Sequence, residues 1–156
     1  MSSSLRDQIR KRQPFDSPEQ EAFLNLLRTT DWLIRDVELV LKPARLSSTQ
    51  YNVLRILRGA GEALSCGEIA ARMITREPDM TRLLDRLEKR GLIARARDTE
   101  DRRIVHTHIT AQGLELLAVL DDPVRNMHRQ QLDHLGETKL GQLSRLLEEA
   151  RERKQP

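Results

Sequence analysis

The sequence predicts a mostly α-helical protein with one small β-hairpin, an α+β fold. Leucine occurs 25 times whereas aromatic residues number only four, and a core built on leucine favours helices over sheet. Serine-led helix starts recur three times, and two short runs of β-type residues flank a polar stretch. We therefore expect helices, then a hairpin, then further helices.

Length and composition exclude several protein classes. At 156 residues the chain has the size of one domain, which can fold without a metal or disulfide. Its one cysteine, Cys66, excludes an intramolecular disulfide. The longest stretch without a charged residue, Ile104–Leu114, is far shorter than the roughly 20 residues of a membrane-spanning helix. We expect a cytoplasmic protein with no role at membranes.

The net charge of +3 is informative only when it is divided along the chain. Residues 1–15 carry four basic side chains against one acidic, and residues 76–103 carry nine against seven. The second segment is nearly balanced, so the placement of its arginines has to support any interaction with nucleic acid.

The N-terminal part is expected to form a tail and one long helix. Residues 1–16 are polar, basic and without periodicity, which predicts a flexible basic tail. Ser17 then offers an N-cap and Pro18 a first helical position. Apolar residues at three- and four-residue spacing predict an amphipathic helix that ends near Lys42-Pro43. We assign residues 17–45 to a dimerisation helix.

Three shorter helices are expected next, the last two joined by the connector Ile74–Glu77. Two short helices with a connector of about four residues match a helix-turn-helix. Capping patterns, glycines and a proline indicate the boundaries of these helices. The first helix is expected to start after Ser47 and to end at Gly59 and Gly61. The second is expected to start at Ser65 and the third at Pro78.

The segments Leu92–Arg95 and Ile104–Ile109 are predicted strands, with the polar stretch Asp98–Arg103 as the tip of a hairpin. A basic hairpin beside a helix-turn-helix is typical of a winged helix, in which one helix enters the major groove of DNA and the wing reaches a minor groove or phosphates. We assign residues 46–110 to this winged helix-turn-helix unit.

Two helices complete the chain. Thr110 caps the first, which is expected to bend at Pro123, and Gly136 separates it from the second. The apolar stripes of these helices and of the long first helix find no partner within the small central unit. A symmetric homodimer would cover them, so we expect residues 111–155 to form C-terminal dimerisation helices.

The helix after Pro78 carries the best candidates for base recognition. With its leucines facing inward, Arg82 and Arg86 lie one turn apart on the outer face. Arginine can form two hydrogen bonds with guanine. A solvated helix face with an Asp85–Lys89 ion pair explains the same pattern. This helix alone therefore does not establish DNA recognition.

Several segments together resemble the MarR family of bacterial winged-helix regulators. The resemblance includes a recognition-helix motif followed by an Asp-x-Arg wing motif, and it extends over about residues 46–117. The segments are Leu46–Leu54, Glu68–Arg72, Thr81–Arg95, Asp101–Arg103 and Ile109–Gly113.

The resemblance implies a homodimer that binds a pseudo-palindromic DNA operator, usually as a repressor that a small aromatic effector releases. It places Thr81, Arg82 and Arg86 in the recognition helix and makes Arg103 the wing arginine, with Asp101 as its orienting partner. Charge and location add four further DNA-binding candidates, which are Arg76, Arg95, Arg97 and Arg102.

The sequence departs from the family at Ile74–Met80, where Arg76-Glu77-Pro78-Asp79 replaces small and hydroxyl residues. Trp32 is a candidate for ligand binding, with core packing as the alternative. Cys66 is expected to be a buried structural thiol, and His106 and His108 to face solvent. No arrangement for catalysis, metal or cofactor binding is readable.

These observations predict a sequence-specific DNA-binding transcriptional regulator that is not an enzyme. A helical dimer that binds a protein, without specific DNA recognition, is the alternative. The acidic residues beside the presumed recognition helix favour this second hypothesis, because carboxylates repel phosphates.

Overall fold

The computed structural model describes residues 4–152. Within them the chain is mostly helical with a small antiparallel sheet, as the sequence predicts. The helices are α1 (Leu5–Gln8), α2 (Pro18–Leu41), α3 (Ser48–Ala60), α4 (Cys66–Arg72), α5 (Met80–Lys89), α6 (Ala111–Leu132) and α7 (Gly136–Arg151), with 3-10 turns η1 (Lys42–Ala44) and η2 (Asp133–Leu135). The strands are β1 (Leu64–Ser65), β2 (Ile93–Arg97) and β3 (Val105–Ile109).

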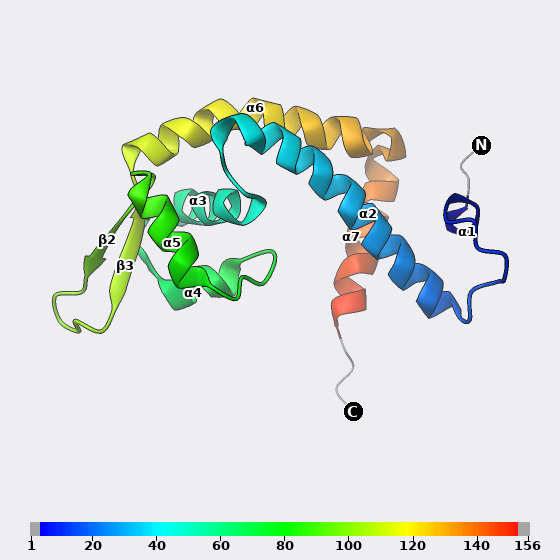
Figure 1. Ribbon diagram of the computed structural model, residues 1–156, viewed down its shortest axis with the longest axis horizontal. Helices are drawn as coiled ribbons and strands as arrows, with labels where there is room; N and C mark the ends of the chain where they lie inside the picture. Colours follow the sequence, from blue (N-terminus) through cyan, green and yellow to red (C-terminus); the bar gives the residue numbers. More distant parts are fainter. Residues whose placement is uncertain (1–3, 153–156) are drawn as a thin grey trace.

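The elements form two regions joined by α6 (Figure 1). Helices α3, α4 and α5 and the sheet make a compact unit at one end, from which the β2–β3 hairpin projects. Helix α2 packs along α6, α7 turns down from the far end of α6, and α1 lies at the end of the molecule opposite the hairpin. Pro123 lies inside α6, which continues through it and arches over the molecule as one helix.

Local capping accounts for most helix boundaries. Ser47 with Gln50 and Ser65 with Glu68 form complete capping boxes at the starts of α3 and α4. Each serine oxygen accepts an otherwise unpaired N–H at a helix start.

The expected end of α3 is confirmed at Gly61, whose φ of 67° provides the left-handed C-cap, although the helix continues through Gly59. The expected start of α5 was wrong. Helix α5 begins at Met80 and not at Pro78, because the Asp79 carboxylate accepts from the N–H of Arg82 and makes Asp79 the N-cap.

The hairpin is part of a three-stranded sheet with the order β1-β3-β2. Strand β1 was not predicted. It has only two residues, which pair with Thr107 and His106 of β3. Such a short run carries no period-2 signal, and its partner lies about 40 residues further along the chain. The pairing nevertheless fixes the wing to the start of α4, because Ser65 is also the N-cap of that helix.

The core is made mostly of leucines from α3, β1, α5 and α6, together with Ile69 of α4 and Ile93 of β2. Leu54, Leu57, Leu87 and Leu117 are all almost completely buried. Gly113 allows α6 to approach β2 closely, because a Cβ there would stand 2.3 Å from the carbonyl oxygen of Leu92. The long helix and the winged unit are therefore packed as one body.

The N-terminal segment differs from the expected flexible tail. Ser4 and Asp7 form a capping box that begins α1, and Leu5 is buried. The Nε of Arg28 on α2 donates to Oε1 of Gln8 at 3.0 Å. Local capping and one buried side chain thus order residues 5–8, while residues 1–3 lie outside the described part of the chain.

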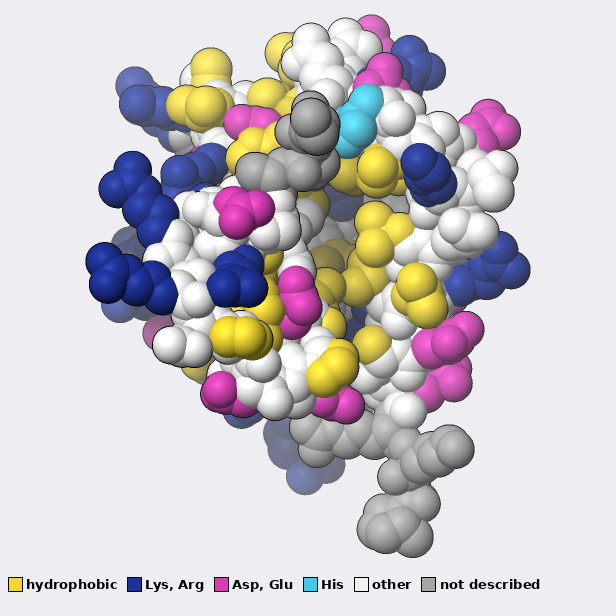
Figure 2. Space-filling model, turned by 90° about the vertical axis from the view of Figure 1, so that its right-hand side faces the viewer, with side chains coloured by type: hydrophobic (Ala, Val, Ile, Leu, Met, Phe, Trp, Pro, Cys, Tyr) yellow, Lys and Arg dark blue, Asp and Glu magenta, His cyan; other side chains and the backbone are white. Residues whose placement is uncertain are grey.

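An apolar face on α2 and α7 is left uncovered. No residue of α7 is buried by the rest of the described chain. Figure 2 shows hydrophobic side chains around a hollow on this side of the molecule. The exposed large apolar residues of these two helices are Phe23, Leu26, Leu27, Trp32, Leu39, Leu143 and Leu146.

Candidate nucleic-acid interface

Helix α5 is a rigid support for outward-facing basic side chains. Its inner face is buried by Met80, Leu83, Leu84 and Leu87, and Thr81, Arg82 and Arg86 are exposed on the other side. Arg76 is exposed in the connector before the helix. Glu77 and Asp79 are the two acidic residues that oppose phosphate binding here. One carboxylate oxygen of Asp79 is engaged as the N-cap, because it accepts from the N–H of Arg82.

The N-terminus of α3 lies beside α5 and contributes polar groups that sequence reasoning missed. A groove of about 370 Å³ separates the two helices, and its lining includes Ser47, Thr49, Arg82 and Arg86. The Oγ of Ser47 and the Oγ1 of Thr49 are 3.0 Å apart. The sequence signal for these residues was present, but it indicates only a helix cap and not their proximity to two arginines.

The tip of the wing is organised by the carboxylate of Asp98. Its Oδ1 accepts from the N–H groups of Glu100 and Asp101 at 2.8 and 2.9 Å, and its Oδ2 lies 2.8 Å from Nε2 of His106. Bonds from Asp101, His106 and Glu100 lower the pKa of Asp98 to about 2. Because this pKa is depressed, the contribution of Asp98 to folding is present above about pH 4 and is lost toward about pH 2.

His106 is only partly solvent-facing, with 37% of its side chain exposed. Its Nε2 lies on Asp98, while its Nδ1 is buried without a hydrogen-bond partner in the described residues. His108, on the same strand, is exposed as expected. The two residues differ because Asp98 lies across the hairpin from His106, which spacing along the strand does not reveal.

Asp101 and Arg103 make the contact that the resemblance implies. The Nε and Nη2 of Arg103 donate to the two oxygens of Asp101, both at 3.0 Å. These bonds lower the pKa of Asp101, chiefly through the side chain of Arg103. The Arg103 side chain remains 90% exposed, so the pairing directs the guanidinium without covering it.

Arg95 has a different environment from the other candidates. Its Nε donates to Oε2 of Glu88 at 2.9 Å, its backbone N–H donates to Oε1 of the same residue, and its Nη2 contacts both Glu88 and Asp85. The hydrogen bonds from Arg95 lower the pKa of Glu88. Arg95 thus ties β2 to α5, and its guanidinium is occupied by protein carboxylates.

Five candidate arginines keep their guanidinium groups available. Within residues 4–152, no hydrogen bond or ion pair engages these side chains, and all five residues are exposed. They lie on the connector, on α5 and on the wing. They are Arg76, Arg82, Arg86, Arg97 and Arg102.

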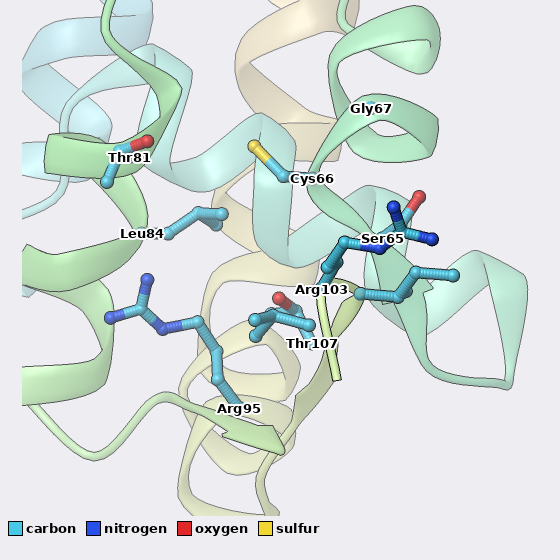
Figure 3. A pocket seen from close by; sticks show the side chains of 10 residues that line it. Ser65, Cys66, Gly67, Thr81, Leu84, Arg95, Arg103 and Thr107 are labelled. Carbon is cyan, nitrogen blue, oxygen red and sulfur yellow. The ribbon is translucent and has the colours of Figure 1, made fainter. Parts of the chain in front are cut away.

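A pocket of about 410 Å³ lies between the wing, α4 and α5 (Figure 3). Cys66, Thr81, Arg95 and Arg103 are among the residues that line it. Cys66 is only half-buried, which corrects the expectation of a buried thiol. The pocket separates the start of α5 from the wing arginine.

Trp32 lies outside the winged unit and is not core. It is 47% exposed on α2, which contradicts core packing within one chain. It lines a groove of about 400 Å³ with Gln8 of α1 and with Arg28 and Arg35 of α2.

The described residues contain no group of three or more His, Cys, Asp or Glu side chains placed to hold a metal. Among the helices of this part of the chain, none has the length and apolar character that crossing a membrane requires.

Comparisons with known proteins agree with this geometry. The model of the MarR family matches residues 46–105. A MarR transcription factor from Planctomyces limnophilus is 45% identical, with a TM-score of 0.68 over 86% of this chain and 98% of the other. The HTH-type transcriptional repressor IacR of Pseudomonas putida is 28% identical over 130 residues, which is 83% of this chain and 77% of IacR.

Two further solved structures are similar to this chain and contain ligands. NadR in complex with 4-hydroxyphenylacetate is 27% identical, with a TM-score of 0.70 over 88% of this chain and 97% of NadR. A mutant MarR from E. coli in complex with operator DNA shares the fold, with 21% identity and a TM-score of 0.75 over 96% and 99% of the two chains. The 45% identity over nearly the whole length of the Planctomyces limnophilus protein decides the assignment. This chain belongs to the MarR family of winged-helix transcriptional regulators.

Proposed function

We propose that this protein binds a pseudo-palindromic operator as a homodimer and represses transcription. The observation that carries the proposal is the set of unpaired arginines that α5, its connector and the wing present on a rigid framework. The operator complex of a protein with the same fold and the repressor activity named for IacR support it. Two recognition helices in successive major grooves would read half-sites about 34 Å apart.

The candidate residues divide into four groups by role. Thr81, Arg82 and Arg86 are proposed to contact base edges, because residues of a recognition helix reach them in the major groove. Arg97, Arg102 and Arg103 are proposed to bind a minor groove or phosphates, with Asp101 orienting Arg103. Arg76 is assigned to a phosphate. Arg95 is proposed to position α5 against the wing.

The chain divides into four functional segments in this proposal. Residues 46–110 bind DNA, and residues 17–45 and 111–155 form the dimer. Residues 1–16 form an N-terminal basic segment, ordered at least over α1. Positions 1–3 and 153–155 of these segments lie outside the described residues.

The uncovered face of α2 and α7 supports the homodimer. Phe23, Leu27 and Leu146 are each more than half exposed in one chain. Large apolar side chains that gather on one exposed side of a protein mark an interaction surface. A second copy of the chain would bury it in a symmetric contact.

A small aromatic effector is proposed to release the dimer from DNA. Trp32 offers an aromatic face to this groove, and Arg28 and Arg35 are guanidinium groups that suit an aromatic acid. Arg35 is paired with Asp31 and Arg28 bonds to Gln8, so an acid would have to compete with these partners. The 4-hydroxyphenylacetate complex of NadR supports this ligand class. We propose further that the protein acts in the bacterial cytoplasm and has no catalytic activity.

Two alanine variants test the DNA-binding roles. Arg82→Ala is expected to lose affinity for the specific site and relax the preference at one base position, by about 1–3 kcal/mol. Arg102→Ala is expected to lower the affinity for duplexes of any sequence by the same factor. It should also reduce the slope of log K against log salt by about one. Binding of both variants to specific and random duplexes across salt concentrations measures the difference. Unchanged affinity in both would overturn the docking model.

Selection of genomic fragments by the purified protein supplies the operator. Enrichment of a palindrome is the expected result and would exclude a purely protein-binding module. Recovery of fragments without a common sequence would favour that module.

A further inference from the structure

Ile74 is the most exposed large apolar residue in the described part of the chain, with 85% of its surface accessible. Single exposed apolar residues are common and need no explanation by themselves. Ile74 differs because its backbone is fixed: its N–H donates to Oδ1 of Asn52 on α3 at 2.9 Å. The preceding residue, Met73, packs against the core. The connector therefore holds this side chain outward on an anchored backbone.

The anchor places Ile74 beside the proposed DNA-binding groove. Asn52 lies one helical turn beyond Thr49, which lines the groove between α3 and α5. Two later residues of the connector region, Glu77 and Asp79, line the same groove together with Arg82. Figure 1 shows the connector as a loop between α4 and α5, next to both helices. Ile74 does not itself line this groove, but it is held on α3 in the same connector as the groove residues Glu77 and Asp79.

The chemistry around Ile74 restricts what it can contact. The next two residues, Thr75 and Arg76, are polar and exposed, and Glu77 and Asp79 follow them. The surface around Ile74 is therefore polar and does not suit an apolar protein groove. On the floor of the major groove the apolar group that distinguishes one base pair from the others is the C5-methyl of thymine. An aliphatic side chain on an otherwise polar DNA-facing surface matches that group.

We propose that Ile74 is a specificity-determining residue that contacts the C5-methyl group of one thymine in each operator half-site. This inference rests on the proposed function and adds a base preference to it. The contact would select thymine without any hydrogen bond, beside the arginines that read other positions. The sequence region that departs most from the family, Ile74–Met80, would then carry a preference of its own.

A coupling experiment with the full-length protein tests the contact. Each thymine of the selected operator is replaced in turn by deoxyuridine, which removes only the methyl group and keeps the base pair. At one thymine position, replacement in one half-site should lower the affinity of the wild-type protein about fourfold, and replacement in both half-sites about fifteenfold. These are the losses expected when one buried methyl group is removed from each contact. Ile74→Ala should bind thymine and deoxyuridine at that position equally well.

The control variant is Val119→Ala. Val119 is also highly exposed, at 71%, and lies on α6 beside Arg90 and Leu92, outside both the connector and the α2–α7 face. The Val119→Ala protein should keep the full sensitivity to deoxyuridine. If Ile74→Ala binds the operator and loses affinity at the same thymine as the wild type, the contact is absent and only this inference fails. If the wild type enriches no sequence from genomic fragments, both the inference and the proposed function fail.

Discussion

Replacing Leu146 by glutamate is expected to separate the proposed dimer into monomers and to weaken operator binding by at least about 100-fold. Leu146 is 62% exposed on α7, so the isolated chain should tolerate the change. In the dimer the two new carboxylates would be buried without partners, at a cost of several kcal/mol. A monomer contacts only one half-site and loses the binding energy of the other. Sedimentation and operator titration measure the two effects.

Val119→Glu is the matched control. Val119 belongs to the segment 111–155, but it is an exposed apolar residue beside Arg90 and Leu92 of the winged unit and not on the α2–α7 face. The Val119→Glu protein should remain dimeric and bind the operator normally. A Leu146→Glu protein that is dimeric and binds DNA like the wild type would show that the interface lies elsewhere.

Arg95→Ala is expected to reduce operator affinity by about 10- to 100-fold, since a misplaced helix loses charge-assisted contacts of about 1.5–3 kcal/mol each. The substitution removes the tie between β2 and α5 and leaves Asp85 and Glu88 as unpaired carboxylates beside the DNA-facing surface. Arg95→Lys should restore only part of the affinity, because an ammonium lacks the planar geometry that engages both carboxylates. Operator titration of each variant provides the measurement.

The salt dependence distinguishes positioning from a direct phosphate contact. If Arg95 acts only by positioning, the slope of log K against log salt stays near the wild-type value, and adding Glu88→Gln to Arg95→Ala recovers affinity. A slope reduced by about one, with no recovery in the double variant, would assign Arg95 to a phosphate instead.

Local sequence signals predicted the helices well. The capping boxes at Ser47 and Ser65 are complete within four residues each, so they could be recognised without knowledge of the fold. Strand β1 could not be found in this way, because its two residues become a strand only when β3 pairs with them. The start of α5 was misplaced because proline is favoured at a first helical position, whereas the Asp79 side chain caps the helix and α5 begins at Met80.

The sequence predicts which arginines belong to the candidate site, but it does not predict which carboxylates surround each of them. Sequence placed Arg82, Arg95 and Arg103 together by charge and motif. The structure separates them, because Glu88 approaches Arg95 from another element and Asp101 approaches Arg103 within the wing. Whether a guanidinium is available depends on these neighbours, and only the Asp101 pairing is encoded locally.

Helix α6 has a mechanical consequence. Its 22 residues span about 33 Å at 1.5 Å per residue. The bidentate Arg58–Asp121 ion pair and the close approach at Gly113 hold the compact unit of α3, α4, α5 and the sheet against α6. A tilt of about 5° at the α7 end would therefore carry the wing and α5 by about 3 Å, close to the roughly 3.4 Å rise of one base pair. A small change beside Trp32 would then move the wing and α5 of each chain out of register with the DNA, without altering any side chain that touches a base.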